Sequence, residues 1–309
     1  PANAGANAVA LGSGPVTFYG GATLFLAGSV GQNAGPTWWP PIVNTFIVPT
    51  NQLGVVHGSQ RGGCNSPLLG SGTFHYVSAY VRDTIGGDWS AFTGQIIFSG
   101  NTNGGNIGLD ATSGFPNARV SMTTNVALYG RVTGVPTIPI GELSGGDDTD
   151  WIESTTSGNA SGVATIFAIG NLNTSSTFGG RIIDTVGLTK VGTGTLALTN
   201  ANLTYTGVTT ISNGVLALLA PATISSSATV MLASASAVLD AKSMGYLSNQ
   251  YDETMTITNS FLVTNSLFTL NSGQILRGVG TLNGSLIAPA GSTVNPGLPV
   301  GPLTVTTNA

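Results

Sequence analysis

The densest group of ionisable side chains in this sequence is acidic. Asp147, Asp148, Asp150 and Glu153 lie close together in one stretch that begins with two glycines. Carboxylate oxygens are ligands that Ca²⁺ prefers, so these four residues form a candidate calcium site. The stretch lacks the D-x-D-x-D-G spacing of a known calcium loop, and a solvated acidic loop is the alternative. No other cofactor is expected. A calcium ion bound here would hold a loop in place and would not take part in a reaction.

A second group combines basic and acidic residues, namely Arg181, Asp184 and Lys190. Polysaccharide lyases need a carboxylate or a metal to neutralise an acidic sugar and a basic residue to accept a proton. These three residues are the nearest approximation to such a site. An ion pair of Arg181 with Asp184 at a strand edge is the commoner role for such residues. We therefore expect that the protein is not an enzyme.

The two histidines, His57 and His75, flank the one cysteine, Cys64, at unequal distances. No G-x-S-x-G motif accompanies them, so a nucleophilic pair is not expected. A single cysteine excludes an internal disulfide. It leaves a buried small hydrophobe or an intermolecular bridge as the two interpretations of Cys64.

Two adjacent tryptophans, Trp38 and Trp39, form the most unusual apolar feature. Neighbouring residues of a strand point to opposite faces, so one of the two rings faces outward unless a loop covers it. Such a pair could cap one end of the fold, bury in a neighbouring subunit or stack on sugars. Trp89 and Trp151, each beside an acidic residue, are interpreted as corner fillers.

The composition favours an all-β fold with a neutral surface. Asp, Glu, Lys and Arg make up 6% of the 309 residues, against about 25% in an ordinary soluble domain. The polar residues are mostly Thr, Ser, Asn and Gly, which suit β-ladders and tight turns. With 41% hydrophobic residues and a net charge of −4 the chain is expected to fold rather than remain disordered.

The same composition excludes some partners. The eight basic residues are scattered and the pI is about 4.8, so nucleic acid is not expected to bind. No apolar run approaches the length of about 18 residues that a membrane span requires. Because translation does not begin at proline, Pro1 suggests that the protein is exported and processed.

Short alternating runs predict strands with one buried face. Helical periodicity is nearly absent, and a weak helical turn is expected within residues 239–251. The apolar pairs spaced two apart are Leu24 and Leu26, Phe46 and Val48, Ile96 and Phe98, Val120 and Met122, Leu196 and Leu198, Leu216 and Leu218, and Leu303 and Val305.

Glycine pairs separate these runs and are expected to supply the positive φ angles of tight corners. A loose Gly-x-Gly repeat before strands favours stacked coils over a closed barrel. Coils of about 20 to 25 residues, each adding roughly 4.8 Å, would give some 12 to 15 coils and a rod of about 60 to 70 Å. We expect one continuous solenoid over residues 1–309, with an irregular insertion at residues 31–72.

One segment carries a specific resemblance. Residues 188–219, LTKVGTGTLALTNANLTYTGVTTISNGVLALL, resemble the autotransporter-associated β-strand repeat, the passenger repeat of large bacterial surface proteins. Residues 278–305 resemble the terminal module of the same proteins. The resemblance implies a right-handed parallel β-helix exported to the cell surface or beyond. The matching positions are Leu188, Lys190, Gly192, Gly194, Thr195, Leu196, Leu198, Asn202, Tyr205, Gly207, Ile211, Gly214 and Leu216.

These observations predict an extracellular structural protein. The open ends of a solenoid expose backbone groups that seek partners, and the last strand, with Leu303 and Val305, is a candidate interface, as are Trp38 and Trp39. A self-assembling filament or surface-layer subunit, with copies of itself as partners, is the leading hypothesis. A monomeric adhesin with a glycan-binding face is the alternative, and a polysaccharide lyase is the third.

Overall fold

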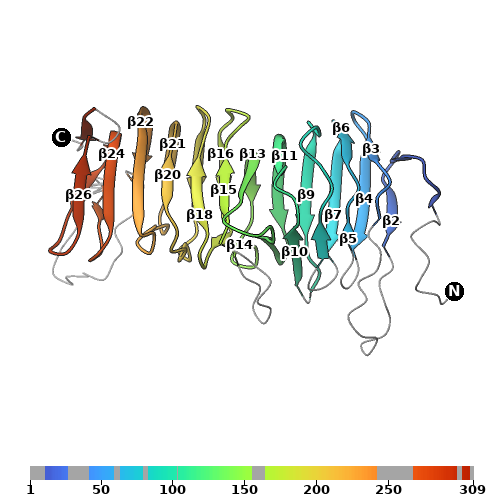
Figure 1. The fold of residues 1–309 in the computed structure, drawn as a ribbon, viewed down its shortest axis with the longest axis horizontal. Coiled ribbons are helices and arrows are strands. Elements are labelled where there is room, and N and C mark those ends of the chain that lie inside the picture. Colours follow the sequence, from blue (N-terminus) through green and yellow to red (C-terminus); the bar gives the residue numbers. More distant parts are fainter. Residues whose placement is uncertain are drawn as a thin grey trace, which may run out of the picture.

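The computed structural model describes residues 11–26, 42–58, 63–78, 83–102, 104–154, 164–241, 267–297 and 301–306. Within these ranges there is no α-helix, and the strands pair in parallel. None of these residues forms a helix long and apolar enough to cross a membrane. The coils stack along one axis to give a rod, with the chain advancing steadily from one end to the other (Figure 1). The predicted all-β parallel solenoid is confirmed.

The strands form three rows along the rod, although some coils have no strand in one of the rows. The first row contains β1 (Val16–Thr17), β3 (Phe46–Val48), β6 (Leu68–Gly70), the first parts of β11 (Phe115–Thr123) and β13 (Thr137–Gly145), β15 (Ile166–Ile169), β18 (Gly187–Lys190), β20 (Thr209–Ile211), the first parts of β22 (Thr229–Asp240) and β24 (Ile275–Asn283), and β26 (Thr293–Pro296). The second row contains β2 (Ala22–Phe25), β4 (Leu53–Gly58), β7 (Thr73–Ser78), β9 (Gln95–Ser99), the second parts of β11 and β13, β16 (Ser176–Phe178), β19 (Thr195–Leu198), β21 (Gly214–Leu218), the second parts of β22 and β24, and β27 (Leu303–Thr306). The third row contains β5 (Gly63–Cys64), β8 (Asp83–Ile85), β10 (Gly105–Leu109), β12 (Val126–Gly130), β14 (Trp151–Glu153), β17 (Arg181–Ile182), β23 (Leu267–Thr269) and β25 (Ser285–Ile287).

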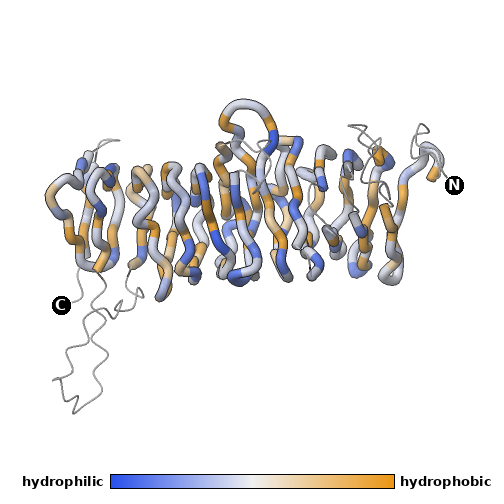
Figure 2. Tube along the Cα trace, turned by 90° about the horizontal axis from the view of Figure 1, so that it is seen from below, coloured by the Kyte–Doolittle hydropathy of each residue, from blue (hydrophilic) through white to orange (hydrophobic). Residues whose placement is uncertain are grey.

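The register between coils sets the length of each repeat. In the second row Val56 pairs with Tyr76, Tyr76 with Phe98 and Phe98 with Met122, which are steps of 20, 22 and 24 residues. These steps lie in the predicted range of coil lengths. All four side chains are fully buried, because successive residues of a strand alternate between the two faces and this set points inward. Figure 2 shows this alternation of apolar and polar residues along the tube.

The segment predicted as an irregular insertion, residues 31–72, is regular where it is described. It carries β3, β4, β5 and β6, each paired in parallel with a neighbouring coil. The outward positions of β4 hold Val55 and His57. Because Val55 is apolar, the alternation of polar and apolar residues by which a strand is recognised is absent from this part of the sequence. Leu24 pairs with Val56, a step of 32 residues, and residues 27–41 within that step lie outside the described part of the chain.

Two smaller expectations also need correction. The expected helical turn at residues 239–251 begins in a strand, since β22 runs to Asp240, and residues 242–251 are not described. Gly145 and Gly146 adopt positive φ as predicted, at 74° and 78°. Gly87 serves another purpose, because a Cβ there would lie 2.0 Å from the carbonyl oxygen of Ser66 in the adjacent coil. Close approach between coils, as well as turning, therefore requires the glycines.

Candidate functional site

Two of the acidic residues bind backbone amides at a corner between β13 and β14. Asp150 accepts hydrogen bonds from the amides of Val126 (3.0 Å, to Oδ1) and Asp147 (3.2 Å, to Oδ2). Asp147 in turn accepts from the amide and the hydroxyl of Thr149, at 2.7 and 2.6 Å. Burial raises the pKa of Asp150, whereas the hydrogen bonds from Thr149 lower the pKa of Asp147. Asp150 thus ties its coil to the preceding one, whereas Asp147 orders its own loop.

The other two carboxylates point to different partners. Asp148 Oδ1 accepts from Asn200 Nδ2 at 2.9 Å and lies 3.9 Å from Arg181 Nε. Glu153, at the end of β14, is 3% exposed and accepts from Trp151 Nε1 at 3.0 Å. Among the described residues no three His, Cys, Asp or Glu side chains form a group that could hold a metal ion. The four predicted calcium ligands are neighbours in sequence but do not converge.

Among the four acidic residues, Glu153 has the carboxyl whose pKa is shifted furthest. Burial raises its pKa to about 8, and the charge of Asp184 adds to the shift. Its Oε1 atom is buried without a hydrogen-bond partner in the described structure. A carboxyl in such surroundings is protonated at neutral pH, which suits burial and does not suit cation binding.

Lys190 is enclosed in a cage of backbone carbonyls. Its side chain is 1% exposed, and Nζ donates to the carbonyl oxygens of Val191 at 2.5 Å, Gly192 at 2.8 Å and Asn213 at 3.3 Å. Asn213 belongs to the next coil, so the ammonium joins two coils at one corner. Burial lowers the pKa of Lys190 to about 8. A lysine whose donors all face protein carbonyls has no access to a substrate.

The other residues of the hypothetical lyase site have separate surroundings. The Arg181 guanidinium stands 5.9 Å from the centre of the Trp151 ring, on the outer face of β14 and β17. Asp184 occupies a turn after β17 with φ of 62° and lies close enough to Glu153 to act on its pKa. Lys190 lies in β18, in the first row rather than the third. The three residues do not share one cleft.

The histidines and the cysteine are also apart. Cys64 is fully buried, and burial raises its pKa to about 12, so a buried, inert thiol is the interpretation that the structure favours. His75 Nε2 lies 2.7 Å from Ser99 Oγ, a contact that the sequence analysis missed. Burial and the nearby His57 lower the pKa of His75. Ser99 is 6% exposed, which keeps its hydroxyl from a substrate.

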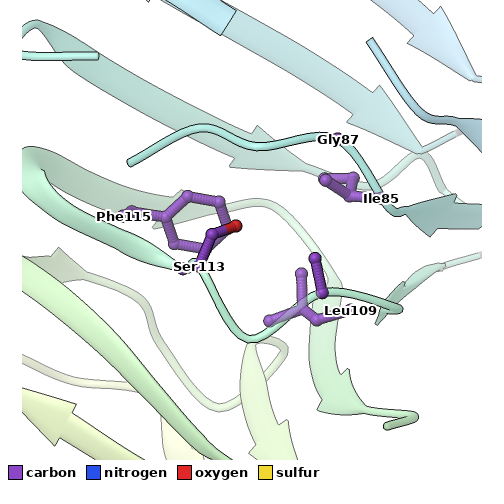
Figure 3. A pocket seen from close by; sticks show the side chains of 7 residues that line it. Ile85, Gly87, Leu109, Ser113 and Phe115 are labelled. Atoms are coloured by element: carbon purple, nitrogen blue, oxygen red, sulfur yellow. The ribbon is translucent and has the colours of Figure 1, made fainter. Parts of the chain in front are cut away.

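One surface hollow lies between β8, β10 and the start of β11 (Figure 3). Its cavity volume is about 10 Å³, which is roughly the space for one water molecule, whereas small-molecule sites usually measure about 300 to 1,000 Å³. Ser113 supplies the one side-chain hydroxyl among its lining residues, and none of them is ionisable. The lining residues are Ile85, Gly87, Leu109, Ala111, Ser113, Gly114 and Phe115. The hollow offers neither an acid nor a base, so no lining side chain could activate the Ser113 hydroxyl as a nucleophile.

The repeat-like segment owes its pattern to stacking. A Cβ on Gly192 would lie 2.0 Å from the carbonyl oxygen of Gly170, and one on Gly194 would lie 2.0 Å from that of Thr174. Tyr205 is fully buried, and its hydroxyl lies 2.7 Å from the hydroxyl of Thr209. The two glycines are therefore explained by contact with a neighbouring coil, and Tyr205 by burial and a hydroxyl contact within its own coil.

The predicted tryptophan interface, Trp38 and Trp39, lies outside the described residues. The other two tryptophans are described: Trp89 is fully buried and Trp151 is half-buried. Leu303 and Val305, the remaining interface candidates, lie in β27 in the last described coil.

One segment of the chain matches a known protein family. Residues 188–218 match the family model described as the Passenger-associated-transport-repeat. No curated protein matches the chain. The predicted resemblance to a passenger repeat is thus confirmed over this segment. The chain carries an autotransporter passenger-type repeat, which indicates a secreted or cell-surface location.

Proposed function

We propose that this chain is an extracellular structural protein, exported and processed, whose solenoid rods associate with one another into a filament or surface layer. In this proposal the protein provides a surface for assembly and does not catalyse a reaction. The burial of two ionisable groups with shifted pKa values, Glu153 and Lys190, and the hydrogen bonds by which Lys190 joins two coils support this proposal. The proposal needs no cofactor.

The observation that carries the proposal is how an apolar ladder of the second row ends. Leu216, Leu239 and Leu282 follow one another in register and are fully buried. Val305 is the next member of the ladder and is 39% exposed. An inward-facing valine exposed to this extent loses much of the burial energy that its ladder partners gain. A further coil placed on β27 would restore it.

The first described coil has a similar surface. Leu24 points inward on β2 and is half-buried, although its ladder partner Val56 is fully buried. Phe25 is 69% exposed, and its ring stacks on His57 at 4.8 Å. Apolar side chains exposed on the first and last described coils suit association between rods, and such heterologous contacts propagate without closing.

Electron microscopy and sedimentation of the purified protein test this proposal. We expect filaments or sheets, and we expect Val305→Lys or Phe25→Lys to weaken association by at least about tenfold, because each places a charge in the contact. Val135→Lys is the matched control, since Val135 is 63% exposed on a bend far from both ends. Circular dichroism verifies that the variants fold. A uniformly monomeric wild-type protein at high concentration would refute the proposal.

The exposed stack of Phe25 on His57 favours one alternative, a monomeric adhesin with a carbohydrate-binding face. Aromatic rings presented to solvent stack on sugars. This alternative predicts saturable glycan binding that is lost in Phe25→Ala, or in Trp38→Ala combined with Trp39→Ala. A lyase, by contrast, would release unsaturated products from acidic polysaccharides, and we expect none.

A further inference from the structure

We propose that His57 and His75 form a surface site for a late first-row transition-metal ion, such as Cu²⁺ or Zn²⁺, with water completing the coordination. The two imidazoles lie on adjacent coils, so an ion bound there links β4 to β7. With two protein ligands the site is smaller than the groups of three that the described residues lack. The inference does not depend on the proposed self-association.

The register of β4 and β7 brings the two histidines together on the outer face of the second row. His57 pairs with Val77 and His75 pairs with Val55, so the histidines are diagonal neighbours. A strand spacing of about 4.8 Å and a rise of about 3.3 Å per residue place their Cα atoms roughly 8 Å apart. An imidazole spans about half of that distance, so both rings can reach one ion at the usual metal–nitrogen distance of about 2.0 to 2.1 Å. Cys64 lies in the third row and takes no part.

Ser99 fixes the orientation of the His75 ring. His75 Nε2 lies 2.7 Å from Ser99 Oγ, and Ser99 is 6% exposed. A metal-binding histidine almost always donates from its second ring nitrogen to an outer oxygen atom, and this hydrogen bond fixes the tautomer. When Nε2 donates to Ser99, Nδ1 carries the lone pair that binds the ion.

Phe25 fixes the orientation of the His57 ring. The two rings stack with their centroids 4.8 Å apart and an angle of 25° between their planes. A stack covers the face of an imidazole and not its edge, where the two nitrogens lie. A ring that is already held in place loses less conformational freedom when it binds an ion.

The protonation of the pair also suits a metal ion. Metals bind the neutral form of imidazole. Burial and the nearby His57 lower the pKa of His75, so His75 is neutral at neutral pH and its lone pair is available to the ion.

The surrounding side chains favour a transition metal over Ca²⁺. Ca²⁺ and Mg²⁺ require oxygen ligands, whereas imidazole suits copper, nickel and zinc, and Cu²⁺ binds most strongly of these. None of the other outward positions of β2, β4, β7 and β9 holds a carboxylate. These positions are Thr23, Phe25, Leu53, Val55, Thr73, Val77, Gln95, Ile97 and Ser99.

Metal titration of the full chain tests the site. The sequence contains two histidines, so a preparation without a histidine tag offers one such pair. We expect calorimetry at neutral pH to show one Cu²⁺ ion per chain, weaker binding of Zn²⁺ and no competition from Ca²⁺. Because the ion links two coils of the folded protein, it should also raise the midpoint of thermal unfolding.

Single variants locate the ion. His57→Gln and His75→Gln should each weaken Cu²⁺ binding by at least about tenfold, because the loss of an outer partner alone typically costs about 10- to 100-fold. Ser99→Ala tests that outer partner and should also weaken binding by about tenfold. Circular dichroism verifies that the variants fold.

The matched control combines His57→Gln with Thr123→His. Thr123 pairs with Ser99 on the same outer face, so this variant keeps two histidines but separates them by two strand spacings, roughly 10 Å. It should bind Cu²⁺ no better than His57→Gln alone, and equal binding by this variant and the wild-type chain would overturn the paired site. A wild-type chain that binds no Cu²⁺, or binding that is unchanged in His57→Gln or His75→Gln, would also overturn the proposal.

Discussion

The two halves of the rod stack their coils in the same way but fill them differently. Near β7 and β9 the interior is aromatic: the Trp89 ring lies 5.2 Å from Phe74 at 89°, 6.2 Å from Phe98 at 11° and 5.6 Å from Phe115. In the repeat-bearing part the interior contains leucine ladders instead, and in one of them Leu196, Leu216 and Leu239 lie in register. Parallel stacking thus accepts either mixed rings or identical aliphatic side chains.

This difference explains why one half was easier to interpret. A ladder of leucines at a nearly constant step, with glycines where backbones approach, produces a repeat that can be read from the sequence. Aromatic rings of different size interlock differently in each coil, so the sequence of this part shows no repeat. The energetic consequences of the two solutions can be compared by mutation.

The largest loss of stability is expected for Trp89→Ala. The indole is fully buried, contacts four aromatic rings and donates from Nε1 to the Ser66 carbonyl oxygen at 2.9 Å. Its removal should lower the free energy of unfolding by about 3 to 5 kcal/mol, measured by denaturant unfolding. Trp151→Ala, at a half-buried position, is the control. If both variants lose a similar amount of unfolding free energy, the aromatic cluster does not stabilise the fold more than a half-buried tryptophan does.

A somewhat smaller loss, about 2 to 4 kcal/mol, is expected for Leu239→Ala in the leucine ladder. The coils above and below can each move toward the cavity that the variant leaves, whereas interlocked rings cannot. Val135→Ala, at an exposed position, should change the unfolding free energy by less than about 0.5 kcal/mol. If Leu239→Ala costs more than Trp89→Ala, the leucine ladder is the less tolerant core.

Lys190→Met tests how much the buried ammonium at the corner of the repeat contributes to stability. Methionine keeps a long apolar stem but leaves the carbonyl oxygens of Val191, Gly192 and Asn213 without their shared donor. We expect a loss of about 2 to 3 kcal/mol and a lower midpoint of thermal unfolding. Lys190→Arg is the control that keeps the charge. A stable Lys190→Met variant would indicate that water can replace the ammonium.

The smallest effect is expected from pH, at Glu153 between the two halves. Its pKa is raised from 4.5 to about 8 in the folded protein, so the folded state holds a proton that the unfolded state has released. This stabilisation is fully present below about pH 4.5 and is lost as the pH rises through about 8. Between pH 5 and 7 the unfolding free energy should fall by about 2 kcal/mol. Glu153→Gln should remove this slope, and a slope unchanged in that variant would assign it to another group.

The fold was predictable because three features of the sequence all indicated parallel coils. They are the alternation of apolar and polar residues, the spacing of the glycines and the motif of residues 188–219. The side-chain contacts were not predictable. Asp148 meets Asn200, which is 52 residues away, and His75 meets Ser99 one coil later. Such contacts depend on the exact length of every intervening coil, and the steps here vary from residue 56 onward. Clusters read along the sequence, such as Asp147 to Glu153, therefore say little about which oxygen atoms meet.

The hydrogen bonds between coils run along the axis of the rod, and this direction determines how the protein responds to load. Tension applied between the two ends acts on those bonds in line, so the coil with the fewest neighbours gives way first. At the described end of the rod that coil contains β26 and β27, which each pair with β24 alone. Each coil of 20 to 24 residues that peels away would lengthen the chain by roughly 70 Å. A rod built in this way yields under force in discrete steps and absorbs work as it lengthens.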